Sequence, residues 1–442
     1  MAAFPESFVS DKEHPLPIAS VGRRSSVRFM DETLPVIVVG GGFAGVKTAT
    51  QLGRKGIDVL LIDKNNYHQF QPLLYQVATA QIGVSEVARP FRAIFRRSNR
   101  VRVVTAEVTA IDPAGRSVTT SDGATYRARI LVLAAGAVPN FFDTPGAEEF
   151  AHPLYSVIDA VSLGANLTSL LDHADKETAG DVNIVVIGGG PTGVETAGAI
   201  AENVKFVLPS YFSSGLAARC HVYLVDMVPT VLNAFSEKSQ SYARKRLVKV
   251  GVRLQLGVGV TEVSADAVTL ADGTVLPSRI VVWAGGLKAG AVLASSGLAH
   301  GRGGRIDVQP DLTARDFEGV YVLGDAANMT DTTGAHLPQL GSVAQQSGKW
   351  AARNIHADLT GGKREPFRYF DKGYMAMIGR GAAVAEIGRK RVQIQGPLAF
   401  AAWLGVHAAL LSGGRQKIGA LISWIEDFVS HERSQVIVGP PE

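Results

Sequence analysis

Two stretches of this chain decide its fold: residues 35–45, PVIVVGGGFAG, and residues 183–193, NIVVIGGGPTG. Each is a β-branched run that enters the pattern G-x-G-x-x-G and continues into a helix-compatible segment. The first glycine of such a pattern allows a tight turn, the second lets the backbone approach a pyrophosphate, and the third lets the helix pack on the strand. The pattern therefore predicts two sites where a helix N-terminus binds a dinucleotide. The expected binding residues are Gly40, Gly42, Phe43, Ala44 and Gly45 in the first site, and Gly188, Gly190, Pro191, Thr192 and Gly193 in the second.

A second pair of segments repeats at nearly the same spacing. Residues 118–136 read VTTSDGATYRARILVLAAG, and residues 268–286 read VTLADGTVLPSRIVVWAGG. Each predicts a hairpin that turns at Asp-Gly, followed by a buried strand that ends in small residues. Corresponding glycines of the loops lie 148 positions apart, from Gly40 to Gly188, and those of the hairpin segments 150 apart, from Gly136 to Gly286. We infer an internal duplication with two similar α/β domains, and we expect Ala135, Gly136 and Gly286 to contact the nucleotides.

An acidic residue at the end of the next strand is the usual partner of a nucleotide ribose. Asp63 takes this place after the first loop, at the end of IDVLLID, and Asp226 after the second, at the end of HVYLVD. A carboxylate at Asp226 would repel a 2′-phosphate, which favours NADH over NADPH. An ordinary turn residue at the end of a strand is the alternative for both positions.

Composition excludes several other classes of protein. The 442 residues are 46% hydrophobic and 19% charged, which is typical of a folded chain, and the net charge is only +4. A single cysteine, Cys220, excludes a disulfide framework, a cysteine-built metal site and a two-cysteine redox couple. We expect an inert buried thiol there, a reducing compartment, no metal and no nucleic-acid partner.

Three segments resemble a known family. Residues 66–80, NYHQFQPLLYQVATA, residues 188–195, GGGPTGVE, and residues 319–326, GVYVLGDA, are similar to segments of the two-dinucleotide-binding flavoproteins. Within that superfamily the chain resembles the type II NADH dehydrogenases, which are single-chain, non-pumping NADH:quinone oxidoreductases. The resemblance implies two Rossmann-like domains of the glutathione-reductase kind, bound FAD, NADH as the electron donor and a quinone as the acceptor.

The same resemblance assigns further residues. It places Asp63, Lys64, His68, Pro72, Leu73, Gly324 and Asp325 near FAD, and Glu195 near the nicotinamide as a catalytic, positioning residue. Gln346 is its second catalytic candidate, and the quinone site would contain Tyr75, Gln76, Ser342 and Gln346. One segment departs from the family: residues 337–348 read LPQLGSVAQQSG, so Gly341 and Ser342 stand where an Ala and a Gln are usual.

The last part of the chain resembles the membrane-binding helices of that family. Residues 397–411, PLAFAAWLGVHAALL, are too short to span a bilayer, and residues 387–420 contain five basic and no acidic residues. An apolar helix pair with flanking cations favours an interfacial, monotopic contact with an anionic membrane surface. A core-packed or dimer-forming helical hairpin is the alternative, and a homodimer stays open.

We therefore expect a peripheral protein on the cytoplasmic face of the plasma (inner) membrane. The predicted domains are a flexible tail at 1–33, an FAD-binding domain at 34–150 and 301–365, an NADH-binding domain at 151–300, and a membrane-associating or dimerising region at 366–442. Two other functions stay open: a soluble NADH-dependent flavin reductase or oxidase (or a ferredoxin-type reductase), and an NADH-sensing flavoprotein that acts through a partner.

Overall fold

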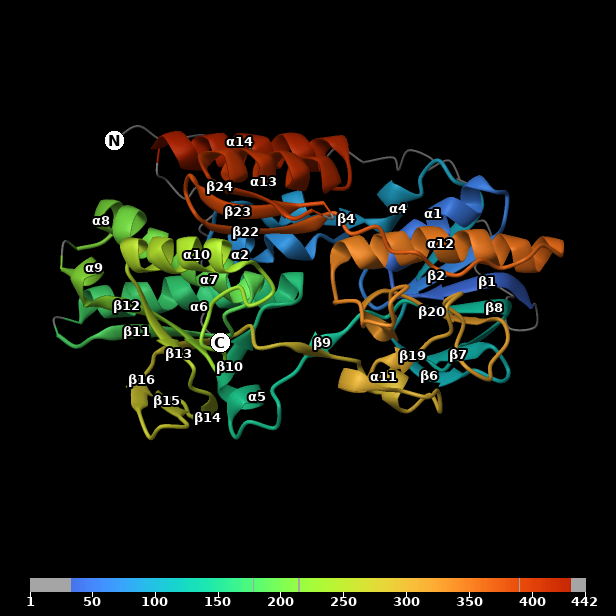
Figure 1. Ribbon diagram of the computed structural model, residues 1–442, viewed down its shortest axis with the longest axis horizontal. Coiled ribbons are helices and arrows are strands. Elements are labelled where there is room, and N and C mark those ends of the chain that lie inside the picture. Colours follow the sequence, from blue (N-terminus) through green and yellow to red (C-terminus); the bar gives the residue numbers. More distant parts are fainter. Residues whose placement is uncertain (1–32, 178, 214, 389, 431–442) are drawn as a thin grey trace, which may run out of the picture.

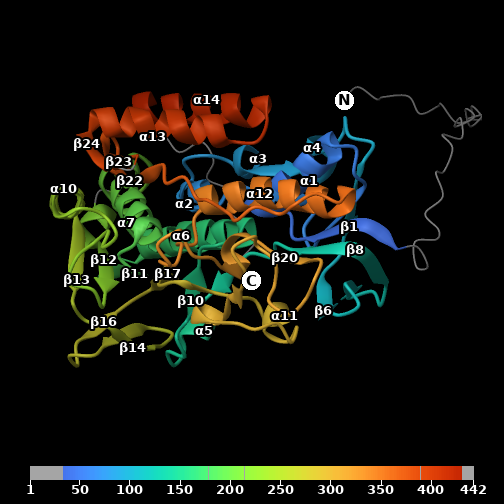
Figure 2. The same cartoon turned by 45° about the vertical axis from the view of Figure 1, so that its right-hand side comes forward.

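The computed structural model describes residues 33–177, 179–213, 215–388 and 390–430. They form two α/β lobes that lie side by side, with a third layer of strands and helices from the end of the chain across one side (Figure 1). Figure 2, turned about the vertical axis, shows the same layer, α13 and α14, above the rest of the protein.

The first lobe is built on a mixed seven-stranded sheet. Its parallel part has the order β5-β2-β1-β8-β20, and an antiparallel pair, β7 and β6, continues from β8. Helices α1 and α12 pack against one another beside this sheet (Figure 1). The elements are β1 (Leu34–Val39), α1 (Phe43–Arg54), β2 (Val59–Asp63), β5 (Val101–Thr105), β6 (Val108–Asp112), β7 (Ser117–Thr120), β8 (Thr125–Leu133), β20 (Val320–Val322) and α12 (Gly341–Thr360).

The second lobe repeats this plan. Its five parallel strands have the order β13-β12-β11-β17-β10, which matches β5-β2-β1-β8-β20 strand for strand. A small antiparallel sheet replaces the β6–β7 extension. The elements are β10 (Ala151–Pro153), α6 (Val157–Lys176), β11 (Val182–Ile187), α7 (Pro191–Glu202), β12 (Cys220–Asp226), α10 (Glu237–Val250), β13 (Val252–Leu256), β14 (Val260–Val263), β15 (Ala267–Leu270), β16 (Val275–Pro277) and β17 (Ile280–Trp283).

Both predicted Asp-Gly hairpins are present. The Oδ1 atom of Asp122 accepts the amide of Ala124, and that of Asp272 accepts the amide of Thr274. Gly123 and Gly273 have φ angles of 82° and 85°, a backbone conformation that glycine adopts without steric cost. The duplication inferred from the sequence is therefore visible in both the parallel strands and the hairpins.

The third layer consists of a three-stranded antiparallel sheet covered by two helices. Its elements are β22 (Gly373–Gly379), β23 (Ala382–Ile387), β24 (Val392–Gly396), α13 (Pro397–Leu410) and α14 (Gly414–Ser430). Trp403 of α13 and Trp424 of α14 are buried in one hydrophobic cluster with the second lobe and with Phe70, Leu73 and Leu74. The layer is therefore packed into the core of the protein rather than loosely attached.

The remaining elements are short connections. They are β3 (Tyr67–Gln69), η1 (Gln71–Leu73), α2 (Leu74–Ala78), α3 (Val84–Val87), β4 (Ala88–Pro90), α4 (Phe91–Ile94), β9 (Val138–Pro139), α5 (Ala147–Phe150), η2 (Asn203–Val207), α8 (Leu208–Tyr211), α9 (Leu216–Arg219), β18 (Leu287–Lys288), α11 (Ala291–Ala294), η3 (Arg302–Gly304), β19 (Ile306–Asp307), η4 (Gly324–Ala326) and β21 (Ala327–Asn328).

The predicted fold class is confirmed: two dinucleotide-binding folds are followed by C-terminal helices. The sequence interpretation missed the three-stranded sheet that precedes those helices. Among the described residues, no helix is both long enough and apolar enough to cross a membrane. The tail predicted at 1–33 lies, apart from Thr33, outside the described residues, and the domain boundaries stay predictions.

The third glycine of each loop generates the first prediction. A Cβ atom at Gly193 would lie 1.7 Å from the carbonyl oxygen of Gly188, so a side chain there forces α7 away from β11. We expect Gly193→Ala to lower the free energy of unfolding by about 1–3 kcal/mol, the usual cost of overpacking. Thermal unfolding without NADH measures this, with Gly190→Ala as the control because a Cβ there has no atom within 4 Å. Equal melting temperatures for the two variants would contradict the prediction.

Candidate active site

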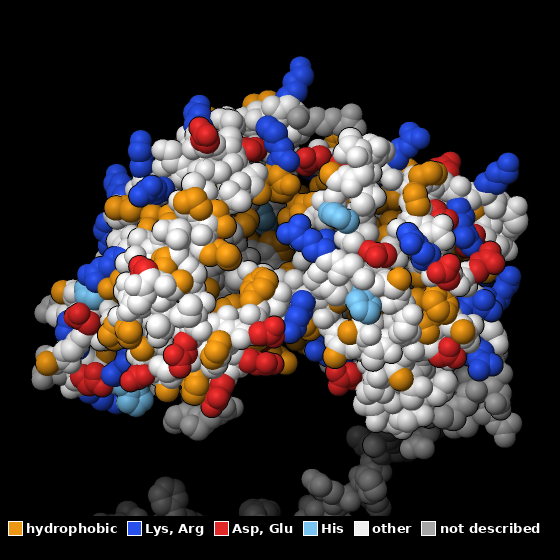
Figure 3. Space-filling view, turned by 60° about the horizontal axis from the view of Figure 1, so that its bottom comes forward, with side chains coloured by type: hydrophobic (Ala, Val, Ile, Leu, Met, Phe, Trp, Pro, Cys, Tyr) orange, Lys and Arg blue, Asp and Glu red, His pale blue; other side chains and the backbone are white. Residues whose placement is uncertain are grey.

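A cavity of about 480 Å³ lies between the two lobes and reaches the C-terminal layer. Figure 3 shows the hollow between the lobes, with hydrophobic side chains in its depth. The cavity brings together most of the residues predicted from the sequence. Those that line it are Gly42, Phe43, Ala44, Pro72, Tyr75, Gly136, Gly190, Pro191, Thr192, Glu195, Gly286, Gly324, Asp325 and Ser342.

The second glycine of each loop faces this cavity. Gly42 and Gly190 are the N-cap residues of α1 and α7, both with a φ angle of −70°. A Cβ atom at either glycine would meet no atom within 4 Å, although the neighbouring third glycines are in tight backbone contact. Two helix N-termini with open backbone therefore point into one cavity, which fits two pyrophosphates. This arrangement fits FAD at the first loop and NADH at the second.

Asp63 and Asp226 bind the glycine loops in the same way. Oδ2 of Asp63 accepts the amide of Gly41 at 2.6 Å, and Oδ2 of Asp226 accepts the amide of Gly189. Burial raises the pKa of Asp63, and the Gly41 amide offsets part of that rise. A carboxylate has about four acceptor positions, so both retain capacity for a ribose diol. Neither aspartate lines the cavity itself, and their ribose contacts stay predictions.

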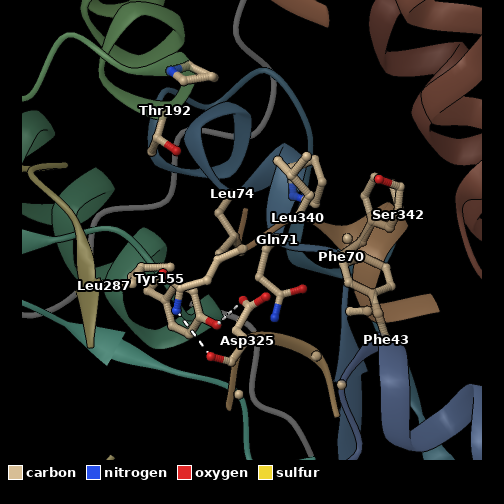
Figure 4. Close-up of a pocket in the computed structure, with 18 of the residues that line it drawn as sticks. Phe43, Phe70, Gln71, Leu74, Tyr155, Thr192, Leu287, Asp325, Leu340 and Ser342 are labelled. Carbon is tan, nitrogen blue, oxygen red and sulfur yellow. Dashed lines mark hydrogen bonds between the residues drawn. The ribbon is translucent and has the colours of Figure 1, made fainter. Parts of the chain in front are cut away.

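Asp325 is a carboxyl group that lines the cavity on the first lobe's side. The Tyr155 hydroxyl donates to its Oδ2 at 3.1 Å, and Gln339 donates to its backbone oxygen at 3.2 Å. Figure 4 shows Tyr155 and Asp325 next to one another in the lower part of the view, with Thr192 of the second lobe above them and Phe43 of the first lobe to their right. Burial raises the pKa of Asp325, and burial together with the carboxylate raises the pKa of Tyr155. A buried carboxyl beside Gly324 fits the hydroxyl-rich part of a flavin nucleotide.

Glu195 lies on α7, in the first turn after the second loop's glycines. Its side chain is only 9% exposed, and its Oε1 accepts the backbone amide of Met377 at 3.1 Å. Burial raises the pKa of Glu195 to about 8, while the Met377 amide and the Trp403 side chain offset part of the rise. The carboxyl is therefore mostly protonated at neutral pH and can donate a hydrogen bond.

The wall formed by the C-terminal layer has a different character. Lys372 directly precedes β22, Tyr374 lies at the start of that strand, and His407 and Leu410 lie in α13. The His407 ring stacks on Trp403 with 3.9 Å between centroids, and burial lowers the pKa of His407 to about 4. This side is therefore aromatic and neutral, apart from the exposed Lys372 ammonium.

The structure places two predicted quinone residues away from the cavity. The Gln346 side chain makes two hydrogen bonds with the backbone of Phe370, at 2.9 and 3.0 Å. Gln76 is 1% exposed and lies behind Tyr75. Gln345, one residue before Gln346, lines the cavity instead. The quinone contacts predicted for Gln346 and Gln76 stay untested.

Other predicted cofactor residues do not line the cavity. His68 Nδ1 lies 2.9 Å from the Gly41 carbonyl oxygen, and burial lowers the pKa of His68, so the neutral ring braces the first loop. The remaining members of this group are Gly40, Gly45, Asp63, Lys64, Leu73, Ala135, Gly188, Gly193 and Asp226.

Sequence reasoning missed Tyr155, Lys372 and His407 as lining residues. Tyr155 and Lys372 lie outside the segments singled out in the sequence, and His407 lies in the apolar segment 397–411, which gave no sign of the cavity. All three line the cavity through long-range packing. Cys220 is buried with a pKa raised to about 11, as expected for an inert thiol. No cluster that could hold a metal is found among the described residues.

Comparisons with known proteins agree with this geometry. The family described as "Pyridine nucleotide-disulphide oxidoreductase" matches residues 34–348. The type II NADH:quinone oxidoreductase Ndh of Mycobacterium tuberculosis is 38% identical over 91% of this chain and 90% of its own length. A type II NADH:quinone oxidoreductase of Staphylococcus aureus is 28% identical over 81% of this chain and 90% of its own length.

Solved structures show the same fold. The structure of NDH2 from Plasmodium falciparum in complex with NADH aligns with a TM-score of 0.82 at 15% identity, over 90% of this chain and 98% of that chain. The glycine loops, the shared cavity and these matches define a two-dinucleotide oxidoreductase. The chain belongs to the pyridine nucleotide-disulphide oxidoreductase family and, within it, to the type II NADH:quinone oxidoreductases.

The raised pKa of Glu195 generates a prediction about stability. An unfolded Glu loses its proton near pH 4.5, whereas folded Glu195 keeps it until about pH 8. The folded state therefore loses stability relative to the unfolded state as the pH rises through this window. Glu195→Gln removes the titration but keeps an oxygen to accept the Met377 amide.

We expect the melting temperature of Glu195→Gln minus that of the wild type to increase from pH 5 to pH 8 and then to level off. Thermal unfolding across pH 5–9 measures this difference. Glu149→Gln, at an exposed position, is the control and should show no such trend. A difference for Glu195→Gln that does not change with pH would rule out a buried, protonated carboxyl.

Proposed function

We propose that this chain is an FAD-dependent enzyme that oxidises NADH and reduces a membrane quinone without pumping protons. The observation that carries the proposal is the pair of open glycine loops that face one cavity, Gly42 from one lobe and Gly190 from the other. The sequence similarity to type II NADH:quinone oxidoreductases supports the choice of donor and acceptor.

Bound FAD supplies the redox chemistry: it accepts a hydride from NADH and passes two electrons to the acceptor. The chain supplies binding and orientation. The N-termini of α1 and α7 hold the two pyrophosphates, and Asp325 and Tyr155 provide polar groups on the flavin side. Glu195, protonated at neutral pH, offers a hydrogen-bond donor next to the second loop without placing a negative charge there. Its role is to position the nicotinamide.

The acceptor side is the wall of the C-terminal layer. Beside this wall, Tyr75 of α2 and Ser342 of α12 carry hydroxyl groups that can turn to quinone carbonyls from their neighbours in the structure, the sulfur of Met377 and the hydroxyl of Tyr369. Lys372 brings a cation to the rim. His407 and Leu410 add an aromatic and apolar surface that suits a quinone ring. The single cysteine lies in β12, is buried and has a raised pKa, so a thiol of this chain is a poor electron acceptor.

Donor choice tests the proposal through Asp226. Residues 227–230 carry no cation to pair with a 2′-phosphate, and the Asp226 carboxylate would repel one. We expect the purified holoenzyme to reduce a water-soluble quinone with NADH and only poorly with NADPH. Asp226→Ala should raise the KM for NADH. It should also lower the ratio of kcat/KM for NADH to kcat/KM for NADPH by at least about tenfold, which corresponds to 1.4 kcal/mol of binding energy. Asp272→Ala, in an exposed turn, is the control.

Wild-type protein that reduces no quinone would contradict the proposed function. An unchanged donor ratio in Asp226→Ala would contradict only the role of this carboxylate.

We further propose that the enzyme is peripheral on the cytoplasmic face of the plasma membrane and binds anionic lipid through α13 and α14. Apolar side chains at helical spacing along α14 are exposed, as is one at the start of α13: Ile418 (61%), Ile422 (59%), Ile425 (63%), Val429 (73%) and Leu398 (76%). Arg415 and Lys417 lie at the start of α14. This apolar face, flanked by cations, fits an interfacial helix pair, because such helices bury one face at the headgroup boundary.

Charge on this face should prevent membrane binding. We expect the double variant Ile422→Asp/Ile425→Asp to remain in the supernatant when sedimented with anionic liposomes, whereas the wild type pellets with them. NADH-to-ferricyanide activity should survive, because both positions face outward while the buried Trp424 is retained. Val275→Asp, a charge at an exposed apolar residue of β16, is the matched control and should pellet. A wild type that stays soluble with liposomes, or a dimer that buries these residues, would contradict the proposal.

A further inference from the structure

Gln76 connects the outermost helix to the wall of the cavity. The indole Nε1 of Trp424, on α14, donates to its Oε1 at 2.8 Å, and its Nε2 donates to the Tyr75 hydroxyl oxygen at 3.2 Å. Gln76 is 1% exposed and Trp424 7%, so both side chains are shielded from bulk solvent. An indole is only a donor, and this fixes which end of the amide faces Tyr75.

The hydrogen bonds continue from Tyr75 to the opposite wall. The Tyr75 hydroxyl donates to the sulfur of Met377 at 3.3 Å, and the backbone amide of Met377 donates to Glu195 at 3.1 Å. Tyr75 and Glu195 line the cavity, while Gln76 and Trp424 do not. One connected set of contacts therefore runs from α14 through α2 and β22 to α7.

Aromatic packing follows the same route. The Trp403 ring lies 6.1 Å from Trp424, 6.5 Å from Tyr75 and 3.9 Å from His407, measured between centroids. Trp424 lies on the inner side of α14, and Ile422 and Ile425 on the outer side. Trp424 thus joins α14 to the residues that contact the Tyr75 hydroxyl, beside the ion pair between Arg380 and Asp427 of α14.

We propose that Trp424 and Gln76 are positioning residues for the acceptor side of the reaction. Gln76 donates to the Tyr75 oxygen and so holds the hydroxyl, whose single proton can turn from the sulfur of Met377, a weak acceptor, to a quinone carbonyl. The inference rests on the proposed function. It assigns Gln76 a role behind the cavity wall in place of direct contact with the quinone. Quinone reduction then depends on the position of α14 on the protein, whereas the reduction of a small soluble oxidant does not.

Two single variants break this bond from opposite sides. Trp424→Phe keeps an aromatic ring but removes the N–H donor, and Gln76→Met keeps the length of the side chain but removes both amide groups. A neutral hydrogen bond changes an equilibrium by roughly three- to tenfold when it is lost. We expect each variant to raise the KM for a water-soluble quinone by about that factor, with kcat/KM for NADH-to-ferricyanide within about twofold of the wild type.

The double variant separates positioning from general damage. If both residues act through one bond, Trp424→Phe/Gln76→Met should raise the quinone KM no more than the worse single variant does. Trp350→Phe is the matched control: it removes an indole donor on α12 that bonds to the backbone carbonyl of Glu365, away from this set of contacts. Its quinone KM should equal that of the wild type. If Trp424→Phe fails to fold, Gln76→Met still tests the bond.

Three results would overturn the inference. The first is an unchanged quinone KM in the folded variants of an enzyme whose wild type reduces quinone. The second is an equal loss of quinone and ferricyanide activity, which a purely structural role would give. The third is full additivity in the double variant. Wild-type protein without quinone activity would instead overturn the proposed function, and the inference with it.

Discussion

The close backbone contact at the third glycine of each loop is the constraint on which the rest of this structure depends. The absence of a side chain at Gly45 and Gly193 lets α1 and α7 begin directly against the carbonyl groups of Gly40 and Gly188. The same turn leaves Gly42 and Gly190 open to the cavity. Because the duplication repeats this turn in both lobes, the N-termini of α1 and α7 face the same cavity. This arrangement makes hydride transfer between two bound nucleotides geometrically possible.

The two halves of the cavity differ in how far the sequence could predict them. The glycine loops, the Asp-Gly hairpins and the apolar C-terminal helices are local patterns, and a period and a turn residue are enough to recognise them. Each of these predictions is confirmed by the structure. The aspartates at the strand ends were also found by position, and both bind the loops.

The acceptor side could not be predicted in the same way because tertiary contacts decide it. Gln346 and Gln76 lie in motif segments, but the backbone of Phe370 and the indole of Trp424 take up their amide groups. Lys372 and His407 line this side of the cavity through long-range packing, which no local pattern shows. The sheet β22–β24 was missed in the sequence, and it packs against α7 and α13. The direction in which a side chain points depends on its hydrogen-bond and packing partners in the fold, and a sequence motif does not show these partners.

Burial raises the pKa of both acidic groups that line the cavity. Glu195 and Asp325, at opposite sides of the cavity, both have raised pKa values because the lobes and the C-terminal layer exclude water. The C-terminal layer therefore has two effects: its inner side closes the site and its outer side exposes a row of apolar residues on α14. An enzyme that takes electrons from a soluble donor and gives them to a lipid-dissolved acceptor needs both.

The most direct test of this account is an anaerobic stopped-flow experiment on the purified holoenzyme. NADH is mixed with the protein while flavin absorbance is followed, and a water-soluble quinone is added in a second mixing step. The account predicts fast loss of the oxidised flavin absorbance with NADH, slow loss with NADPH, and fast recovery with quinone. Flavin that NADH does not reduce, or reduced flavin that every quinone reoxidises only slowly, would contradict it.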